Sequence, residues 1–211
     1  MKNSPENIGI IILAAGASNR LGKPKQLLQF EGETLLKRAV RTALASRCRS
    51  VIVVLGAQAE NPKREIAEFD VEIVENPNWE NGMGTSIQIG LKSLLMIHPD
   101  VSGVILTVCD QPFVSANLIS QIVESFQTTN APIVACSYED TIGVPALFSR
   151  QFFPEFMALK ADNGAKKIIF EHREKVIEIP FEAGAIDIDT EQDYLNAKKL
   201  KIENGKWKIQ E

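Results

Sequence analysis

The spacing of apolar residues changes along this chain. Short continuous apolar runs alternate with segments in which apolar residues recur at helical spacing. Short apolar runs, typical of strands buried on both faces, occupy residues 8–15, 50–55, 71–74, 103–108, 133–137 and 176–179. Apolar residues at helical spacing occupy residues 33–46, 59–69, 86–96, 115–126, 163–172 and 190–200. The alternation predicts an α/β fold: one three-layer α/β/α domain around a mostly parallel central sheet, with ligands at the carboxyl ends of the strands.

The last residues have a different pattern, which predicts a β-hairpin after the final helix. Thr190 is suited to cap that helix. Two short alternating runs between residues 201 and 209 flank Asn204-Gly205, a dipeptide typical of tight hairpin turns. We expect Trp207 and Ile209 to share one face of the hairpin and to pack on the domain. The predicted organisation is a domain of residues 1–200 with a hairpin tail of residues 201–211.

Composition and charge narrow the class of protein. A length of 211 residues suits one domain with a sizeable core. The formal net charge of −4 does not indicate a nucleic-acid-binding surface, and no apolar run approaches the length of a membrane span. Cys48, Cys109 and Cys136 lie far apart, so neither a disulfide framework nor a zinc site is expected. Reduced thiols, and a polar N-terminus unlike a signal peptide, favour a cytoplasmic protein.

The loop after the first strand, LAAGASNRLGKPKQ at residues 13–26, is a candidate ligand site. Gly16, Ser18 and Gly22 allow sharp turns that bring several backbone N–H groups to one anion. Arg20 and Lys25 add the full charges that a triphosphate requires. A solvated basic turn would also account for the charges, but a motif of this length rarely recurs by chance. The sequence therefore predicts a phosphate site.

Two acidic elements are candidates for a metal site. Asp110 follows the apolar run 103–108, so we expect its carboxylate in the ligand crevice, unless it caps the next turn. Asp187 and Asp189 would face one cation if they lay in a strand. Before a helix, they would instead be a charge pair favoured by the helix dipole. Carboxylate oxygens are ligands that Mg²⁺ prefers.

A loop rich in small residues opens the helix predicted at 86–96. Gly82 and Gly84 allow the backbone to approach a flat ligand closely, while Thr85 and Ser86 offer hydroxyl groups and N-terminal amides. An ordinary capped helix start would need only one of these features. We interpret Trp79 as a packing residue of this loop rather than as a stacking platform for a base.

These motifs resemble a known enzyme family. The first loop resembles the signature L-A-A-G-x-S-x-R-x-G-x-x-K of nucleotidyltransferases with a glycosyltransferase-A-like fold, also described as nucleotide-diphospho-sugar transferase-like. Within that group, the chain is most similar to the molybdenum-cofactor cytidylyltransferases. The resemblance implies nucleotide binding by Leu13, Ala14, Ala15, Gly16, Ser18, Gly84, Thr85 and Ser86. It implies catalysis by Lys25, Arg20 and Asp110, and a metal site of Asp110, Asp187 and Asp189, with Asp187 preferred of the last two.

The resemblance extends to an acceptor pocket. Relatives have Gly-x-Pro followed by Gly-Asp-x-Gly-Ala-Arg; here these places hold Gly143-Val144-Pro145 and residues 161–166. The implied acceptor-binding residues are Gly143, Pro145 and Lys166. Ala161 and Lys166 depart from the family pattern, and a lysine lacks the bidentate fork of the arginine that it replaces.

The implied activity is Mg²⁺-dependent transfer of CMP from CTP to a phosphorylated small-molecule acceptor, molybdopterin or the molybdenum cofactor, with release of pyrophosphate. The implied protein partner is a molybdoenzyme or its chaperone. A methylerythritol-phosphate cytidylyltransferase would share Pro24-Lys25-Gln26, but its His-Asp-Ala-Ala-Arg-Pro segment is missing. A guanylyltransferase usually has Leu-Ala-Gly-Gly, where this chain has Ala15 in third place. A non-catalytic chaperone that delivers the cofactor stays open, although Lys25 and Asp110 favour catalysis.

Overall fold

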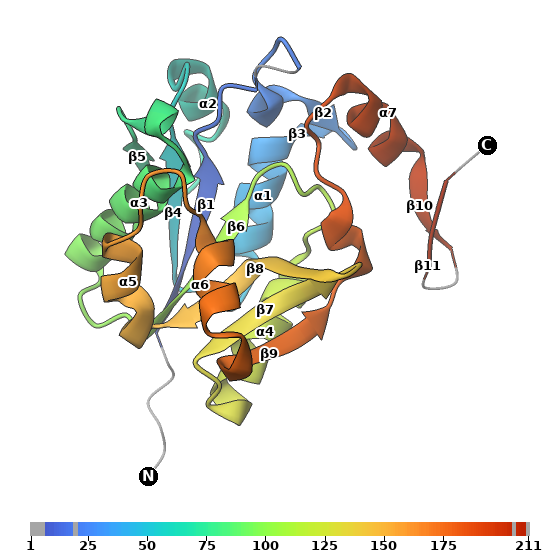
Figure 1. Cartoon of the computed structure of the whole chain (residues 1–211). Coiled ribbons are helices and arrows are strands. Elements are labelled where there is room, and N and C mark those ends of the chain that lie inside the picture. Colours follow the sequence, from blue (N-terminus) through green and yellow to red (C-terminus); the bar gives the residue numbers. More distant parts are fainter. Residues whose placement is uncertain (1–6, 19–20, 204–205, 210–211) are drawn as a thin grey trace.

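The structure is a computed structural model that describes residues 7–18, 21–203 and 206–209. Its centre is a seven-stranded sheet in the order β5-β4-β1-β6-β8-β7-β9 (Figure 1). The strands are β1 Ile8–Ala14, β4 Ser50–Leu55, β5 Glu72–Glu75, β6 Gly103–Val108, β7 Ile133–Tyr138, β8 Thr141–Ser149 and β9 Val176–Pro180. Strand β8 is antiparallel to β6 and β7, while the other neighbours pair in parallel. Six of the seven strands therefore end at the same edge of the sheet.

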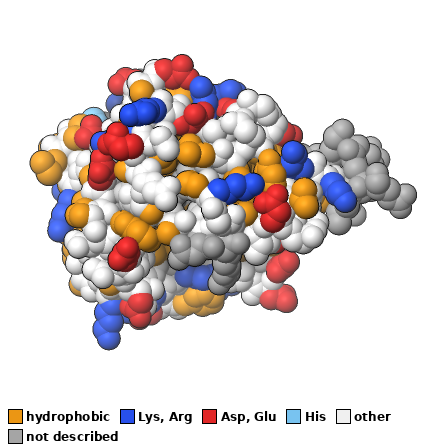
Figure 2. All heavy atoms as spheres, turned by 90° about the horizontal axis from the view of Figure 1, so that it is seen from above, with side chains coloured by type: hydrophobic (Ala, Val, Ile, Leu, Met, Phe, Trp, Pro, Cys, Tyr) orange, Lys and Arg blue, Asp and Glu red, His pale blue; other side chains and the backbone are white. Residues whose placement is uncertain are grey.

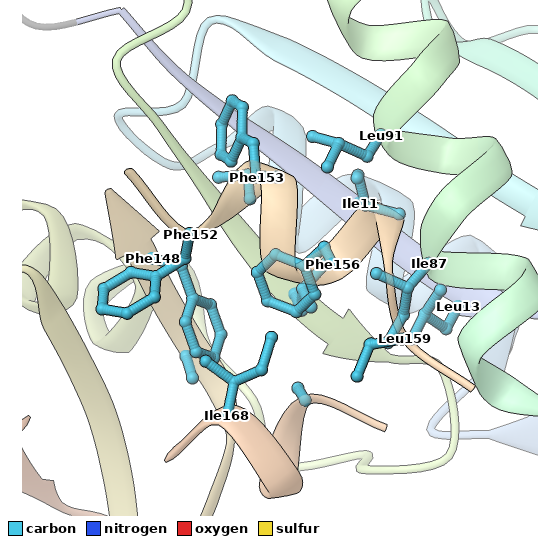
Figure 3. Close-up of a cluster of buried hydrophobic side chains, with 14 of the residues drawn as sticks. Ile11, Leu13, Ile87, Leu91, Phe148, Phe152, Phe153, Phe156, Leu159 and Ile168 are labelled. Carbon is cyan, nitrogen blue, oxygen red and sulfur yellow. The ribbon is translucent and has the colours of Figure 1, made fainter. Parts of the chain in front are cut away.

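Helices cover both faces of this sheet. They are α1 Leu35–Leu44, α2 Glu60–Glu65, α3 Met83–Ile97, α4 Ala116–Thr129, α5 Phe153–Met157, α6 Ala165–Glu171 and α7 Glu191–Lys199. Alternate residues of β1 belong to two separate apolar clusters, because successive side chains of a strand point to opposite faces. Figure 3 shows side chains of β1, α3, α5 and α6 in one cluster. Helices α1 and α4 contribute to the other. The predicted three-layer α/β/α domain with a mostly parallel sheet is confirmed.

Strands β4 and β6 have the predicted bounds, whereas β8 and α5 were not predicted. Pro145 is the reason that β8 was missed, since a proline inside an apolar run argues against a strand. The pairing of β7 with β8 passes from Ala135↔Ala146 directly to Cys136↔Gly143. Pro145 lies in this irregular step, where its missing N–H leaves no ladder hydrogen bond broken. A hairpin of β2 Gln29–Phe30 and β3 Glu33–Thr34 was missed as well.

The predicted C-terminal hairpin is present as β10 Leu200–Glu203 and β11 Lys206–Ile209, which pair antiparallel in a sheet of their own. The side chains of Trp207 and Ile209 lie outside the described part of the structure, so their packing and the domain boundary at residue 200 stay predictions. Thr190 caps α7, as predicted. None of the helices in the described ranges is long and apolar enough to cross a membrane.

Candidate active site

A cavity of about 210 Å³ lies at the edge where β1 and β6 end, beside the start of α3. Its walls are formed by Leu13, Ala14, Ala15, Gly16, Lys25, Gln26, Trp79, Gly82, Met83, Ser86, Val108, Cys109 and Asp110. Figure 2 looks down on this edge of the molecule, where positive and negative side chains are interspersed with apolar ones. The cavity thus unites the two segments that the sequence predicted to bind a nucleotide with the predicted catalytic pair Lys25 and Asp110.

Two side chains fix the loop that follows β1. The Gln26 side chain, 1 % exposed, donates from Nε2 to the carbonyl oxygens of Ala14 (2.8 Å) and Gly16 (2.9 Å). Ser18 Oγ accepts a hydrogen bond of 2.9 Å from the backbone N–H of Lys25. Ser18 has a φ of 58°, so the chain turns sharply there. Ser18 therefore holds the loop and is not part of the cavity wall, while Arg20 lies outside the described residues.

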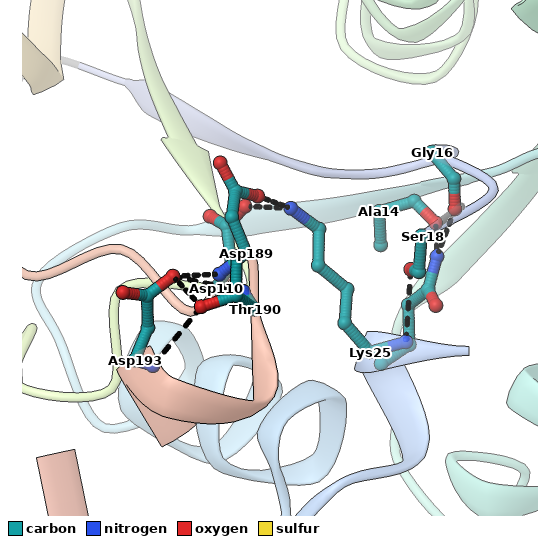
Figure 4. A network of polar contacts seen from close by, with 9 residues as sticks. Ala14, Gly16, Ser18, Lys25, Asp110, Asp189, Thr190 and Asp193 are labelled. Atoms are coloured by element: carbon teal, nitrogen blue, oxygen red, sulfur yellow. Dashed lines mark hydrogen bonds and ion pairs between the residues drawn. The ribbon is translucent and has the colours of Figure 1, made fainter. Parts of the chain in front are cut away.

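Lys25 reaches across the site to two carboxylates (Figure 4). Its Nζ donates to Asp110 Oδ2 and, at 2.8 Å, to Asp189 Oδ1. Burial alone would lower the pKa of Lys25, but the charge of Asp110 and hydrogen bonds to both carboxylates raise this pKa above its ordinary value. The lysine therefore keeps its positive charge at neutral pH, and binding of a triphosphate requires such a charge.

Asp110 lies two residues beyond the end of β6, and its carbonyl accepts a hydrogen bond of 3.0 Å from the backbone N–H of Ile188. Its Oδ1 is buried and has no hydrogen-bond partner within the described ranges. The neighbouring thiol, Cys109, is buried, and burial raises its pKa to about 12. A thiol with such a pKa is not a nucleophile at neutral pH. Asp110 is thus the residue of this turn whose side chain can bind a further group, through Oδ1.

Asp187 and Asp189 lie in an irregular segment before α7, so the strand alternative is wrong. Asp189 faces Lys25, and its backbone N–H donates to Asp193 Oδ2 at 3.3 Å. Asp187 is an exposed residue, yet protein atoms crowd its carboxyl group. This desolvation, followed by the charge of Asp110, raises the pKa of Asp187 to about 6. Asp189 is therefore the carboxylate that pairs with Lys25, whereas Asp187 is the one with a raised pKa.

These acidic residues fit a magnesium ion that is shared with a substrate. Among the described residues, no three His, Cys, Asp or Glu side chains are arranged as a preformed metal cage. Magnesium is commonly held by only one or two carboxylates, with water and substrate phosphates as its other ligands. Asp110 Oδ1 has no partner, and the charge of Asp110 acts on the carboxyl of Asp187. Both observations suit a cation between these two carboxylates.

Gly82 precedes α3 and Gly84 lies in its first turn, and both have packing roles that the sequence did not predict. Gly84 donates from its N–H to the Ala161 carbonyl at 2.9 Å, and a Cβ at Gly84 would lie 2.9 Å from the Asn163 carbonyl oxygen. Gly82 has a φ of 125°, and a Cβ there would lie 3.0 Å from the Asp162 Cα. Both glycines allow the loop to pack against residues 160–163. Gly82 also lines the cavity, whereas Gly84 does not.

The other predicted binding residues also fall into two groups, those that line the cavity and those that do not. Ser86 lines the cavity, but Thr85 turns its hydroxyl back to the carbonyls of Asn78 and Gly82. None of the predicted acceptor residues lines it: Gly143 and Pro145 are buried in β8, and Lys166 is exposed on α6. Their role in acceptor binding stays a prediction.

Five residues of the cavity wall were not assigned as binding residues from the sequence: Gln26, Trp79, Met83, Val108 and Cys109. Trp79 was interpreted as a packing residue only. A signal for Trp79 was available in Gly56, directly after β4, because a Cβ there would lie 2.8 Å from Trp79 Cβ. A glycine at the end of a buried strand indicates that another group approaches the backbone closely.

Among curated proteins, the chain resembles an oxidoreductase and a cytidylyltransferase. It is 33% identical over 132 residues to nicotine blue oxidoreductase of Paenarthrobacter nicotinovorans, covering 62% of this chain and 63% of that protein, so it spans less than two thirds of that relative. It is 25% identical over 193 residues to the molybdenum cofactor cytidylyltransferase of Escherichia coli (strain K12), covering 91% of this chain and 96% of that protein.

Solved structures and a family model also match the chain. The crystal structure of Rv0371c from Mycobacterium tuberculosis H37Rv matches with a TM-score of 0.80 and 31% identity, covering 91% of this chain and 97% of that chain. Its complex with manganese matches with a TM-score of 0.73 and 29% identity, covering 90% of this chain and 96% of that one. Residues 10–176 match the family described as MobA-like NTP transferase domain. Because this match covers most of the sequence, the chain belongs to the MobA-like NTP transferase family and is a nucleotidyltransferase.

Proposed function

We propose that this nucleotidyltransferase transfers CMP from CTP to a phosphorylated small-molecule acceptor, molybdopterin or the molybdenum cofactor. The observation that carries the proposal is the pairing of Lys25 with Asp110 on the wall of the cavity. A fixed cation and a carboxylate with an unpaired oxygen are the groups that a triphosphate and its metal require. The full-length similarity to a molybdenum cofactor cytidylyltransferase supports this choice of nucleotide and acceptor.

The reaction needs positioning and charge neutralisation more than covalent help from the protein. A terminal phosphate oxygen of the acceptor attacks the α-phosphorus of CTP, a new P–O bond forms, and the bond to the β-phosphate oxygen breaks to release pyrophosphate. Lys25 neutralises charge on the triphosphate and on the leaving pyrophosphate. We assign the same task to Arg20.

Asp110 and Asp187 would hold the divalent cation, with Asp189 beside them. When bound, that ion supplies positive charge next to the reacting phosphate oxygens. The manganese complex of Rv0371c supports a divalent metal in a related protein, and Mg²⁺ is our proposal for this chain. The free thiols of Cys48, Cys109 and Cys136 support the expected reducing, cytoplasmic compartment.

Release of pyrophosphate tests the proposal directly. The protein is incubated with Mg²⁺, one nucleoside triphosphate at a time and molybdopterin, with methylerythritol phosphate as the rival acceptor. We expect release with CTP and molybdopterin, and CTP should outcompete GTP. Preference for GTP would replace the assignment with a guanylyltransferase, and turnover with methylerythritol phosphate alone would replace the acceptor. Tight binding of the cytosine dinucleotide cofactor without any turnover would indicate a delivery chaperone.

A further inference from the structure

Asn76 follows β5 and forms a hydrogen-bond network behind the cavity wall. The residue is 3 % exposed, and its backbone N–H donates to the Leu55 carbonyl at 2.7 Å. Its side-chain Oδ1 accepts from the backbone N–H of Asn78 at 3.0 Å. Its Nδ2 donates to Thr85 Oγ1 at 2.8 Å and to Ser86 Oγ at 2.9 Å. One buried amide thus joins β5 to the first turn of α3.

The backbone of Asn78 fixes the orientation of this amide. A backbone N–H can only donate, so the Asn76 atom that faces it must be the oxygen. The amide nitrogen then faces the two hydroxyl groups, and both hydroxyl oxygens must accept. The direction of each hydrogen bond is therefore set by chemistry.

Ser86 is left with one proton to donate. The Thr85 hydroxyl gives its proton to the carbonyl of Asn78 (3.0 Å) or Gly82 (2.8 Å). No acceptor for the Ser86 proton occurs among the residues that the structure describes, although Ser86 is only 5 % exposed and lines the cavity. A nearly buried donor without a partner is costly, so the arrangement suits a ligand that brings an acceptor.

Trp79 and Met83, which precede Ser86 in the sequence, are apolar residues of the cavity wall. The charged residues of the wall, Lys25 and Asp110, belong to other loops. A flat base suits an apolar wall, and a triphosphate suits the charged residues. We propose that Asn76 is a positioning residue that makes Ser86 a hydrogen-bond donor to an acceptor atom of the nucleotide base. For CTP, which rests on the proposed function, that atom is O2 or N3 of cytosine.

The substitution Asn76→Asp tests this inference because it changes polarity with almost no change of volume. The introduced carboxylate can still accept from the N–H of Asn78, but it can no longer donate to Ser86. The Ser86 proton then turns to the carboxylate, and Ser86 presents lone pairs to the base. We expect the Kd for CTP, measured by calorimetry at about pH 8, to rise at least about tenfold. The Kd for tripolyphosphate, which has no base, should stay within about twofold.

Ser86→Ala and the double variant show whether the effect passes through Ser86. Ser86→Ala should also weaken CTP binding by about tenfold and leave tripolyphosphate binding unchanged. In the Ser86→Ala background, Asn76→Asp should have no further effect on the Kd, since no hydroxyl remains to be turned. Two independent, multiplying losses would overturn the inference, because Asn76 would then act on the cavity in another way.

Ser86→Ala also decides the matter if Asn76→Asp does not fold, since unchanged CTP binding by that variant overturns the inference by itself. Failure of the proposed function has a different signature. If the unmodified protein binds GTP in place of CTP, the cytidylyltransferase proposal fails, and the same cycle with GTP still tests the donor role of Ser86. If it binds tripolyphosphate but no nucleotide, the inference is overturned.

Discussion

The predicted nucleotide site and the predicted acceptor site differ in how their residues come together. On the nucleotide side, the loops after β1 and β6 meet, and Lys25 lies against Asp110. On the acceptor side, Gly143 and Pro145 are buried in β8, while Lys166 is exposed on α6. The first group forms a cavity wall and the second does not.

Strand direction explains this difference. Parallel strands end at one edge of the sheet, so residues that follow β1 and β6 are neighbours by topology. Strand β8 runs the other way, and its first residues, near Gly143, lie at the ligand edge instead of its last. A motif at the start of an antiparallel strand is held by ladder bonds and packing. A loop after a parallel strand therefore reveals its role in sequence more readily than a motif inside a strand.

Asp110→Asn should have the largest effect, because Asp110 is the residue on which both the lysine and the proposed metal depend. The substitution removes one charge and almost no volume, so we expect metal-dependent turnover to be lost while the fold is kept. Pyrophosphate release at saturating Mg²⁺ and a melting curve measure the two properties. Asp189→Asn is the matched control, since Asp189 also pairs with Lys25 but its side chain is 48% exposed. Turnover of Asp110→Asn at the rate of the unmodified protein would contradict the assignment.

Lys25→Ala should lower kcat by about two to three orders of magnitude, which is typical for loss of one positioned charge in a transition state. Binding of CTP should weaken less, because the base and the backbone N–H groups still hold the nucleotide. Steady-state kinetics and calorimetry separate the two effects. Lys23→Ala is the control from the same loop: its side chain is 51% exposed and pairs with Glu191 at 3.4 Å. Equal rates for both variants would mean that Lys25 is an ordinary surface residue.

Much of the nucleotide side could be predicted from sequence because local rules decide it. Apolar runs predicted β4 and β6, and the loops after β1 and β6 located Lys25 and Asp110. Contacts between distant segments could not be predicted in this way. The sequence indicated that Gly84 allows a ligand to approach the backbone, but residues 160–163 occupy the space beside this glycine. Ser18 was predicted to bind the nucleotide, whereas its side chain holds the backbone of Lys25.

Gly56→Ala tests whether the wall formed by Trp79 is needed on the nucleotide side. A Cβ at Gly56 would press on the Ala15 carbonyl and lie 2.8 Å from Trp79 Cγ, so the indole must move. Overpacking of this kind costs about 1–3 kcal/mol of unfolding free energy, and the altered wall should weaken CTP binding. Gly16→Ala is the matched control for stability, since no atom lies within 4 Å of a Cβ there. Chemical denaturation compares the two variants, and equal stability would show that Trp79 yields without cost. Calorimetry compares CTP binding by Gly56→Ala with that of the unmodified protein, because Gly16 itself lines the cavity.

Asp187→Asn should have the smallest effect, seen only in the pH dependence of stability without metal. Crowding by protein atoms, then the charge of Asp110, raises the pKa of Asp187 from 3.8 to about 6. Between these values the folded state binds more protons than the unfolded state, so this group stabilises the fold at low pH and ceases to do so as pH rises to about 6. Asparagine does not titrate. Solvent screens this exposed side chain, so we expect about 1 kcal/mol of the effect to remain. Relative to Asp187→Asn, the unmodified protein should therefore lose about 2–4 °C of melting temperature between about pH 4 and 7 in the presence of a chelator. A constant difference across that range would mean that the Asp187 carboxyl titrates normally and that neither crowding nor the charge of Asp110 shifts its pKa.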